Sequence, residues 1–254
     1  MNLASLLAQL QLTDSAFPSG LYTLSHGLEG YVQSGLAGPA DLPGLLADLL
    51  RHSVGPGDAT ALVLAHRAVT EEDWDLLVAA DRRLHAIKLN RELRVAATRT
   101  GRQVLETAVR VFGRPGPDGR SAVPGRFLSP GRPVAPGRRA SLEKLASLVR
   151  DRVTPGNHAV VVGAVHAVLG VPEAQAVTGD LFAFASSWTG AAVRLGRVDF
   201  RQAQEILYGA HPEIARAAAT ALAARSPDDI HGSVPLADTV SAAHERAPAR
   251  LFTT

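Results

Sequence analysis

The chain has 254 residues, of which 46% are hydrophobic and 20% are charged, with a formal net charge of +2. These values are typical of a globular protein and argue against an intrinsically disordered one. Cysteine is absent, which excludes disulfides, thiolate nucleophiles and cysteine-ligated zinc or iron–sulfur sites and is compatible with a cytoplasmic location.

Charge and apolar runs argue against nucleic acid or membrane as a partner. The pI is near 9.4, but the basic residues are almost all arginines, and they are scattered among acids rather than gathered with aromatic residues. The longest apolar stretch, residues 159–171, is interrupted by His166 and is too short to cross a bilayer. No apolar run led by Lys or Arg opens the chain, so we also expect no secretory signal.

The first helix is predicted over residues 2–12, where leucines repeat with helical spacing. Phe17-Pro18-Ser19-Gly20 then forms a loop, because proline restricts its own φ and glycine permits a positive φ. A second helix should start near Thr23 or Ser25 and end at Ser34. Function is often carried by such loops, but a purely structural role for the loop, with Phe17 in the core, is the simpler interpretation.

Apolar spacing predicts further helices at residues 39–50, 58–68, 70–87 and 90–112. Gly55-Pro56-Gly57 should interrupt the pattern, because proline lacks an N–H and clashes with the preceding turn. Residues 70–73 resemble a capping box that begins the helix ending at Ile87.

The second half of the chain is also helical in pattern, with helices predicted at residues 141–152, 158–169, 181–195, 200–209 and 212–225. The helix at 181–195 has an apolar stripe that includes Trp188 and small residues on its other faces. We therefore expect this helix at the centre of the molecule, with neighbours at close approach.

Two stretches depart from the helical pattern. Residues 113–139 are mainly Pro, Gly and Arg and cannot bury enough apolar surface, so we predict a flexible surface loop. Residues 226–254 are broken by prolines, and only 236–247 looks helical. We predict a helical core over residues 1–225 and a tail over 226–254 that is ordered by a partner. The fold class is therefore all-α, a single-domain bundle of about ten helices with no strand pattern or repeat.

The residues predict no catalytic centre or bound cofactor. Phosphate-binding, dinucleotide-binding, nucleophile-elbow and His-Glu-x-x-His motifs are all absent from the sequence. Of nine histidines, His158 and His166 lie about 12 Å apart along one helix, too far to share a metal ion. His26 and His244 each have a glutamate within three residues, as is common on helix surfaces. Arg194, at the end of an apolar helix, either complements the helix dipole or faces a partner carboxylate.

Four blocks, in order and spanning nearly the whole chain, resemble the urease accessory protein F family: residues 10–29 with Asp-Ser-x-Phe-Pro-x-Gly, residues 90–105 with Arg-Glu-Leu-Arg, residues 188–207 with Ala-Val-Arg-Leu, and residues 235–252 with Pro-Leu-Ala-Asp, His-Glu and Arg-Leu-Phe. The first and last blocks are specific, and their order strengthens the match. The chain departs from the family at residues 197–200, where many relatives have Pro-Leu-Gly-Gln, and in its longer loop at 113–139.

The resemblance implies an all-helical, dimer-forming accessory protein without enzymatic activity or a stably bound cofactor. It implies that the chain binds the D/H-type urease accessory protein and recruits the nickel-carrying G-type GTPase, so that nickel reaches apo-urease. It also implies that Tyr22 and Arg250 lie together when the tail is ordered, where the arginine would pin the tail by stacking or hydrogen bonding. Glu29 and Arg194 are expected on the exposed recognition surface. The partner-binding residues expected from the resemblance are Tyr22, His26, Glu29, Arg194, Gln204, His244, Arg250, Leu251 and Phe252.

Two other interpretations remain open. The chain could instead activate the GTPase, or regulate its fidelity, through an arginine finger, although no feature of the sequence says which arginine. A helical metal-dependent enzyme that uses His26 or His158 is the third possibility.

Overall fold

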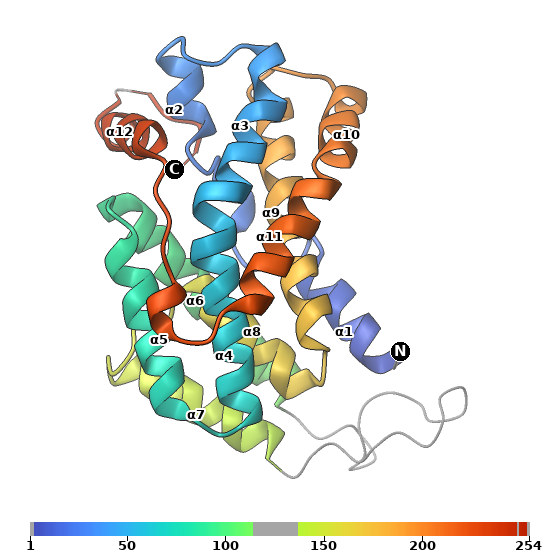
Figure 1. The fold of residues 1–254 in the computed structure, drawn as a ribbon, viewed down its shortest axis with the longest axis vertical. Helices are drawn as coiled ribbons and strands as arrows, with labels where there is room; N and C mark the ends of the chain where they lie inside the picture. Colours follow the sequence, from blue (N-terminus) through green and yellow to red (C-terminus); the bar gives the residue numbers. More distant parts are fainter. Residues whose placement is uncertain (1–2, 114–136, 248, 253–254) are drawn as a thin grey trace.

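A computed structural model describes residues 3–113, 137–247 and 249–252, and within these ranges it contains helices and turns but no strand (Figure 1). This confirms the predicted all-α class. The predicted loop at residues 113–139 lies almost wholly outside the described residues. No helix in the described ranges is long and apolar enough to cross a membrane.

Twelve α-helices lie in the described ranges. In order they are α1 (Leu3–Thr13), α2 (Leu28–Gln33), α3 (Leu42–Leu49), α4 (Thr60–Thr70), α5 (Trp74–Ile87), α6 (Arg91–Phe112), α7 (Arg138–Arg150), α8 (His158–Leu169), α9 (Glu173–Arg194), α10 (Phe200–Gly209), α11 (His211–Ala223) and α12 (Pro235–His244). A π-helical segment, η3 (Leu50–Ala59), joins α3 to α4, and single 3-10 turns lie at Leu21–Thr23, Pro39–Asp41 and Pro227–Asp229.

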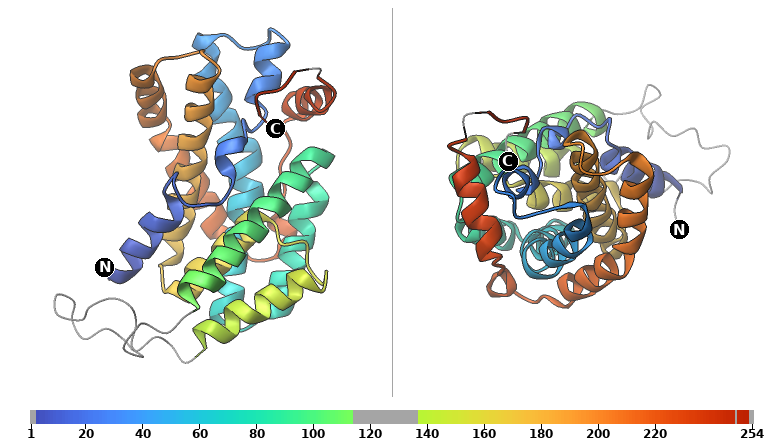
Figure 2. Two further views of the ribbon diagram at one scale, coloured as in Figure 1. Left: turned by 180° about the vertical axis from the view of Figure 1, so that it is seen from behind. Right: turned by 90° about the horizontal axis from the view of Figure 1, so that it is seen from above.

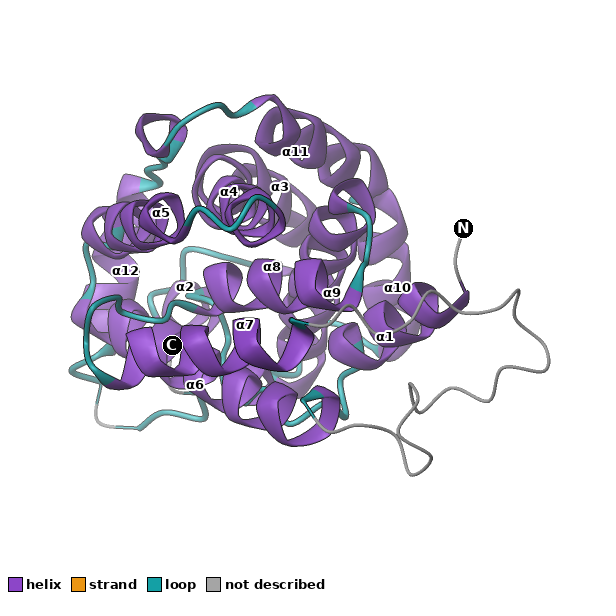
Figure 3. Ribbon diagram, turned by 90° about the horizontal axis from the view of Figure 1, so that it is seen from below, coloured by secondary structure: helices purple, strands orange, loops and turns teal. Residues whose placement is uncertain are grey.

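The two most completely buried helices are α4 and α8, which pack against each other inside the bundle (Figure 3). The helix predicted to be central, residues 181–195, is the second half of α9, and its outward face is open to solvent at Phe182 and Ser186. That prediction is wrong, because small residues permit close neighbours on every side but do not require them. Trp188 on its inner face is buried, as the apolar stripe predicted.

The chain does not break at Gly55-Pro56-Gly57. Instead α3, η3 and α4 run on as one helical column, visible at the centre of Figure 1. Proline has no N–H to donate, and the segment around Pro56 is π-helical rather than α-helical. The Ser233 N–H donates to the His52 carbonyl at 2.9 Å, and the His231 N–H donates to the Pro56 carbonyl at 3.2 Å. The column therefore continues through Pro56 as a π-helical segment that also receives donors from the start of the tail.

Two predicted helix starts are also wrong. The N-cap of α5 is Asp73, whose carboxylate accepts from the Leu76 N–H at 2.9 Å, so the helix begins at Trp74 and not with a capping box at Thr70. Helix α7 begins at Arg138, before the predicted cap Ser141. Both errors are a few residues long, as expected where several adjacent polar residues can cap.

A buried carboxylate joins α5 to the loop between α7 and α8. Asp81 is fully buried and accepts from the Thr154 hydroxyl at 2.6 Å, from the Gly156 N–H at 2.6 Å, and from the Asn157 backbone N–H and side-chain amide at 3.0 and 2.7 Å. These bonds satisfy an otherwise costly buried charge and fix the start of α8.

The tail lies beside the N-terminal loop. Figure 2 shows α12 and the last described residues next to α2 from two further sides, at the opposite end of the molecule from α7. Helix α12 packs directly on α2, so the tail is in contact with the N-terminal part of the chain.

Candidate functional site at the two ends of the chain

The N-terminal loop has the irregular backbone that its sequence predicts. Gly20 lies in the left-handed region at φ 81°, and His26 does so at φ 52°. A left-handed conformation is unfavourable for a residue with a Cβ, so His26 is held there by its surroundings. Helix α2 begins at Leu28, later than predicted, although the Ser25 hydroxyl does accept from the Glu29 N–H at 3.2 Å.

The tail is held by Glu29, which is buried. One carboxylate oxygen accepts from the Leu251 N–H at 2.8 Å and from the Gln33 amide at 3.2 Å; the other accepts from the Phe252 N–H at 2.9 Å and contacts His244 Nε2 at 3.0 Å. We call this arrangement the clasp: Glu29 with Gln33, His244, Leu251 and Phe252. The expectation that Glu29 is exposed on a recognition surface is wrong, because its four partners occupy both oxygens.

A second carboxylate, Glu92, supports the clasp. It accepts from the Arg250 guanidinium at 2.6 Å and lies 4.0 Å from His244 Nδ1. The Asn90 side-chain amide donates to the Asp238 carbonyl at 3.0 Å, so the start of α6 also holds α12. Sequence reasoning missed Gln33 and Glu92 as functional candidates. For Glu92 the available signal was its place between two arginines in the Arg-Glu-Leu-Arg block. That pattern is equally typical of a solvent-exposed helix.

Arg194 joins the loop to the tail. Its guanidinium carbon lies 3.9 Å from the centre of the Tyr22 ring and 4.5 Å from that of Phe252, and it also donates to the Tyr22 carbonyl. Its Nε donates to the Gly190 carbonyl at 3.2 Å, which caps α9 as the structural interpretation predicted. The arginine on Tyr22 is therefore Arg194, whereas the expected Tyr22–Arg250 contact is replaced by the ion pair of Arg250 with Glu92.

These contacts leave two apolar side chains facing outward. Tyr22 is 66% exposed and Leu251 is 64% exposed, although Phe252 beside Leu251 is buried. We call this surface the docking face, made of Tyr22, Arg194, Arg250 and Leu251. The structure does not bring Gln204 to it, because Gln204 is exposed on α10, on the other side of α3 from α12 (Figure 1).

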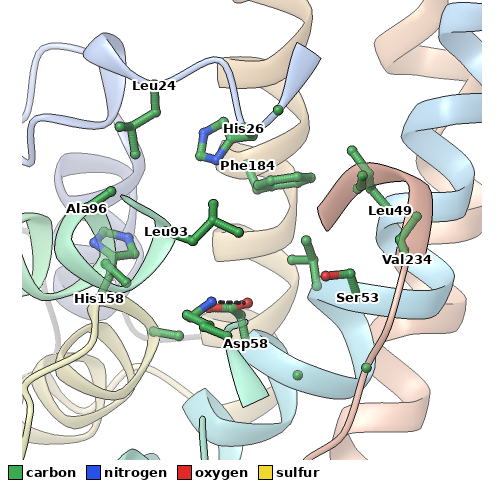
Figure 4. Close-up of a pocket in the computed structure, with 18 of the residues that line it drawn as sticks. Leu24, His26, Leu49, Ser53, Asp58, Leu93, Ala96, His158, Phe184 and Val234 are labelled. Atoms are coloured by element: carbon green, nitrogen blue, oxygen red, sulfur yellow. Dashed lines mark hydrogen bonds and ion pairs between the residues drawn. The ribbon is translucent and has the colours of Figure 1, made fainter. Parts of the chain in front are cut away.

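A cavity of about 170 Å³ lies between the N-terminal loop and the start of the tail (Figure 4). Its walls are mostly apolar, with Leu24, Leu93 and Phe184 around a space that His26 and His158 border. His26 packs edge-on against Phe184 with ring centres 4.8 Å apart, and its Nε2 is enclosed without a hydrogen-bond partner. Within the described ranges, no group of three or more metal-ligating side chains gathers here or elsewhere, so nothing in the geometry favours the metal-enzyme interpretation.

Replacing Gly30 with alanine should weaken the docking of α12. A Cβ at Gly30 would lie 2.7 Å from Val240 Cγ1 and 3.1 Å from the Val240 carbonyl, so α12 must shift outward. Overpacking of this kind costs about 1–3 kcal/mol. Faster amide hydrogen exchange in α12 would reveal the loss. The control is Gly44→Ala on α3, where nothing lies within 4 Å of the new Cβ and exchange in α12 should not change.

The chain is similar to known proteins over nearly its whole length. A family model described as UreF matches residues 36–211, which is most of the chain but omits the N-terminal loop and the tail. Pairwise relatives cover these segments as well. A urease accessory protein UreF of Trichodesmium erythraeum is 32% identical over 97% of this chain and 95% of its own length. Those of Yersinia pestis and Yersinia enterocolitica are each 28% identical over 99% of both chains.

Proposed function

Because the chain belongs to the UreF family of urease accessory proteins, we propose that it is a scaffold for nickel delivery to apo-urease. As a member of an accessory family it is not an enzyme. In this proposal the chain binds the D/H-type accessory protein, forms a homodimer within the complex and recruits the G-type GTPase in the cytoplasm. The GTPase carries the nickel, which is cargo of the complex and not a cofactor of this chain.

One observation supports the proposal above the others: the two ends of the chain form a single face. The clasp holds the tail against the N-terminal loop, and Arg194 contacts rings from both segments. The exposed Tyr22 and the exposed Leu251 therefore belong to two segments that Arg194 and the clasp hold together. Aromatic, arginine and exposed apolar side chains next to each other are typical of protein interfaces.

Substituting Leu251 with serine should weaken recruitment of the GTPase by about tenfold without releasing the tail. The Leu251 side chain is mostly exposed, and only its backbone N–H belongs to the clasp, so the fold loses little packing. Only a minority of interface residues, the central anchors, cost more than about 1 kcal/mol each when truncated, and the proposal places Leu251 among them. Co-purification with the D/H-type and G-type proteins measures the effect. The control is Val111→Ser, which likewise replaces an exposed apolar side chain with serine, at the C-terminal end of α6.

Measuring GTP hydrolysis in the same mixture of proteins separates the scaffold from an activator. If this chain supplied an arginine finger, GTP hydrolysis by the G-type protein would accelerate by orders of magnitude when the two are mixed. We expect recruitment without such acceleration. Normal recruitment by the Leu251→Ser protein would count against the docking face, whereas acceleration would favour the activator.

A further inference from the structure

One side of α6 carries arginines that border both segments of the docking face. Arg91, Val95, Arg99 and Arg102 are all exposed, and they recur at the spacing that places residues on one side of a helix. We call these four residues the basic strip. From its first residue to its last, the strip rises about 16 Å along the helix axis.

The basic strip is continuous with the docking face. The Arg99 guanidinium donates to the hydroxyl of Thr23 at 3.0 Å, and Thr23 follows Tyr22 in the N-terminal loop. Arg91, at the start of the strip, lies 3.8 Å from Glu245 of the tail. A partner seated on the loop and the tail would therefore lie against this side of α6 as well.

Most of the positive charge of the strip is not compensated within the chain. In the described ranges Arg102 makes no ion pair, and Arg99 bonds only to a neutral hydroxyl. Acids do alternate with arginines in this part of the sequence, but Glu92 is buried and bonded to Arg250. Glu106, exposed one turn beyond Arg102, pairs with no arginine in the described part of the chain. The fold therefore leaves a cationic surface where the sequence alone shows mixed charges.

We propose that the basic strip is part of the recruitment surface and that the partner presents acidic side chains to it. Arginine binds carboxylates through two parallel N–H bonds and is enriched at protein interfaces. Apolar side chains lie beside it, since Val95 is 53% exposed and Leu89, just before α6, is 68% exposed. A second copy of this chain does not fit the strip, because a two-fold contact centred there would set arginine against arginine.

This inference rests on the proposed function, in which the G-type GTPase occupies the docking face. The strip adds the chemistry by which that partner is recognised. Complementary charges at the edge of an interface mainly accelerate association and suppress wrong partners. The recruited protein should therefore dock with its acidic surface along α6 while its apolar contacts fall on Tyr22 and Leu251.

The test reverses two charges of the strip in the complex with the D/H-type protein. Arg99→Glu combined with Arg102→Glu should weaken binding of the G-type protein at least about tenfold, mainly through slower association, because attraction becomes repulsion. Surface plasmon resonance gives both rate constants. Raising NaCl from about 50 to about 500 mM should weaken binding by the unsubstituted chain about tenfold and binding by the variant much less, since salt screens exposed charges.

Three further variants separate the strip from other causes. Arg102→Glu alone keeps the bond from Arg99 to the N-terminal loop and should still weaken binding about threefold. Replacing Arg99 and Arg102 together with lysine keeps both charges and should change affinity less than about threefold. Arg110→Glu with Arg225→Glu, at exposed positions at the end of α6 and after α11, changes the net charge equally and should have less than about a twofold effect.

The outcomes distinguish the strip from the proposed function. Normal, salt-insensitive recruitment by the strip variant would overturn the strip and leave the docking face standing. Equal losses in the strip variant and in the Arg110 and Arg225 variant would assign the effect to overall charge and also overturn it. Loss of binding to a DNA duplex, with recruitment unchanged, would assign the strip to nucleic acid instead. If the unsubstituted chain recruited no GTPase at all, the proposed function would fail together with this inference.

Discussion

Replacing Glu29 with glutamine should release the tail at neutral pH. Glutamine has nearly the same shape but offers a single acceptor oxygen, and its amide would face the N–H groups of Leu251 or Phe252. Unsatisfied donors around a buried site and the loss of charge-assisted bonds together cost about 3–5 kcal/mol. The amides of Leu251 and Phe252 should then exchange with solvent at least about a hundredfold faster, which two-dimensional NMR can follow.

A change of the same type at Glu245 is the matched control. Glu245 follows α12, and its only ion pair in the described residues is with Arg91 at 3.8 Å, whose side chain is 81% exposed. Exposed pairs of this kind contribute about 0–1 kcal/mol, so Glu245→Gln should leave the tail docked. Protection of the Leu251 and Phe252 amides that survives Glu29→Gln would show that apolar packing of Phe252, and not the clasp, holds the tail.

Replacing Asp81 with alanine should destabilise the whole chain by about 3–5 kcal/mol. The substitution leaves four buried donors from Thr154, Gly156 and Asn157 without an acceptor, and each such donor costs about 1–3 kcal/mol in part offset by local rearrangement. The midpoint of urea unfolding measures the loss. Because Asp81 does not contact the docking face, the folded fraction should still bind partners normally.

Asp75→Ala on the same helix separates this effect from changes in helix propensity and in the interaction with the helix dipole. Asp75 is exposed in the first turn of α5, where a carboxylate contributes about 0.3–1 kcal/mol. If both substitutions destabilised the chain by a similar amount, the buried hydrogen bonds of Asp81 would contribute little to stability.

Local sequence patterns were sufficient to predict most helices. They were insufficient where a segment is hydrogen-bonded by backbone groups from a distant part of the chain. The regular apolar spacing of α6, α8 and α10 predicted them to within a residue or two, since buried stripes set those helices. The break at Pro56 was predicted from local chemistry alone and is absent: the column becomes π-helical there, and Ser233, far along the chain, donates to one of its carbonyls. No pattern within a short window carries that information.

The candidate site divides in the same way. The irregular loop was expected from Pro18 and Gly20. The position of Tyr22 near the end of the chain was expected from the family resemblance. The burial of Glu29 was not, because a glutamate in the first turn of a short helix is normally a solvated, dipole-stabilising residue. Its partners include the backbone N–H groups of Leu251 and Phe252. Almost every residue has a backbone N–H, so the sequence gives no sign that these two bind a carboxylate.

The hydrogen bond from Ser233 to the His52 carbonyl has a consequence for how far the end of the chain can travel. The bond ties the start of the tail to the helical column and takes no part in the clasp, although Ser233 also borders the cavity. If the clasp opened while this bond held, the tail would stay anchored to the column. The roughly 20 residues beyond it form a tethered arm with a maximum reach of roughly 70 Å. An arm anchored at mid-column samples a bounded volume around its own protomer, so a partner captured by the free end is delivered back to the same face at high local concentration.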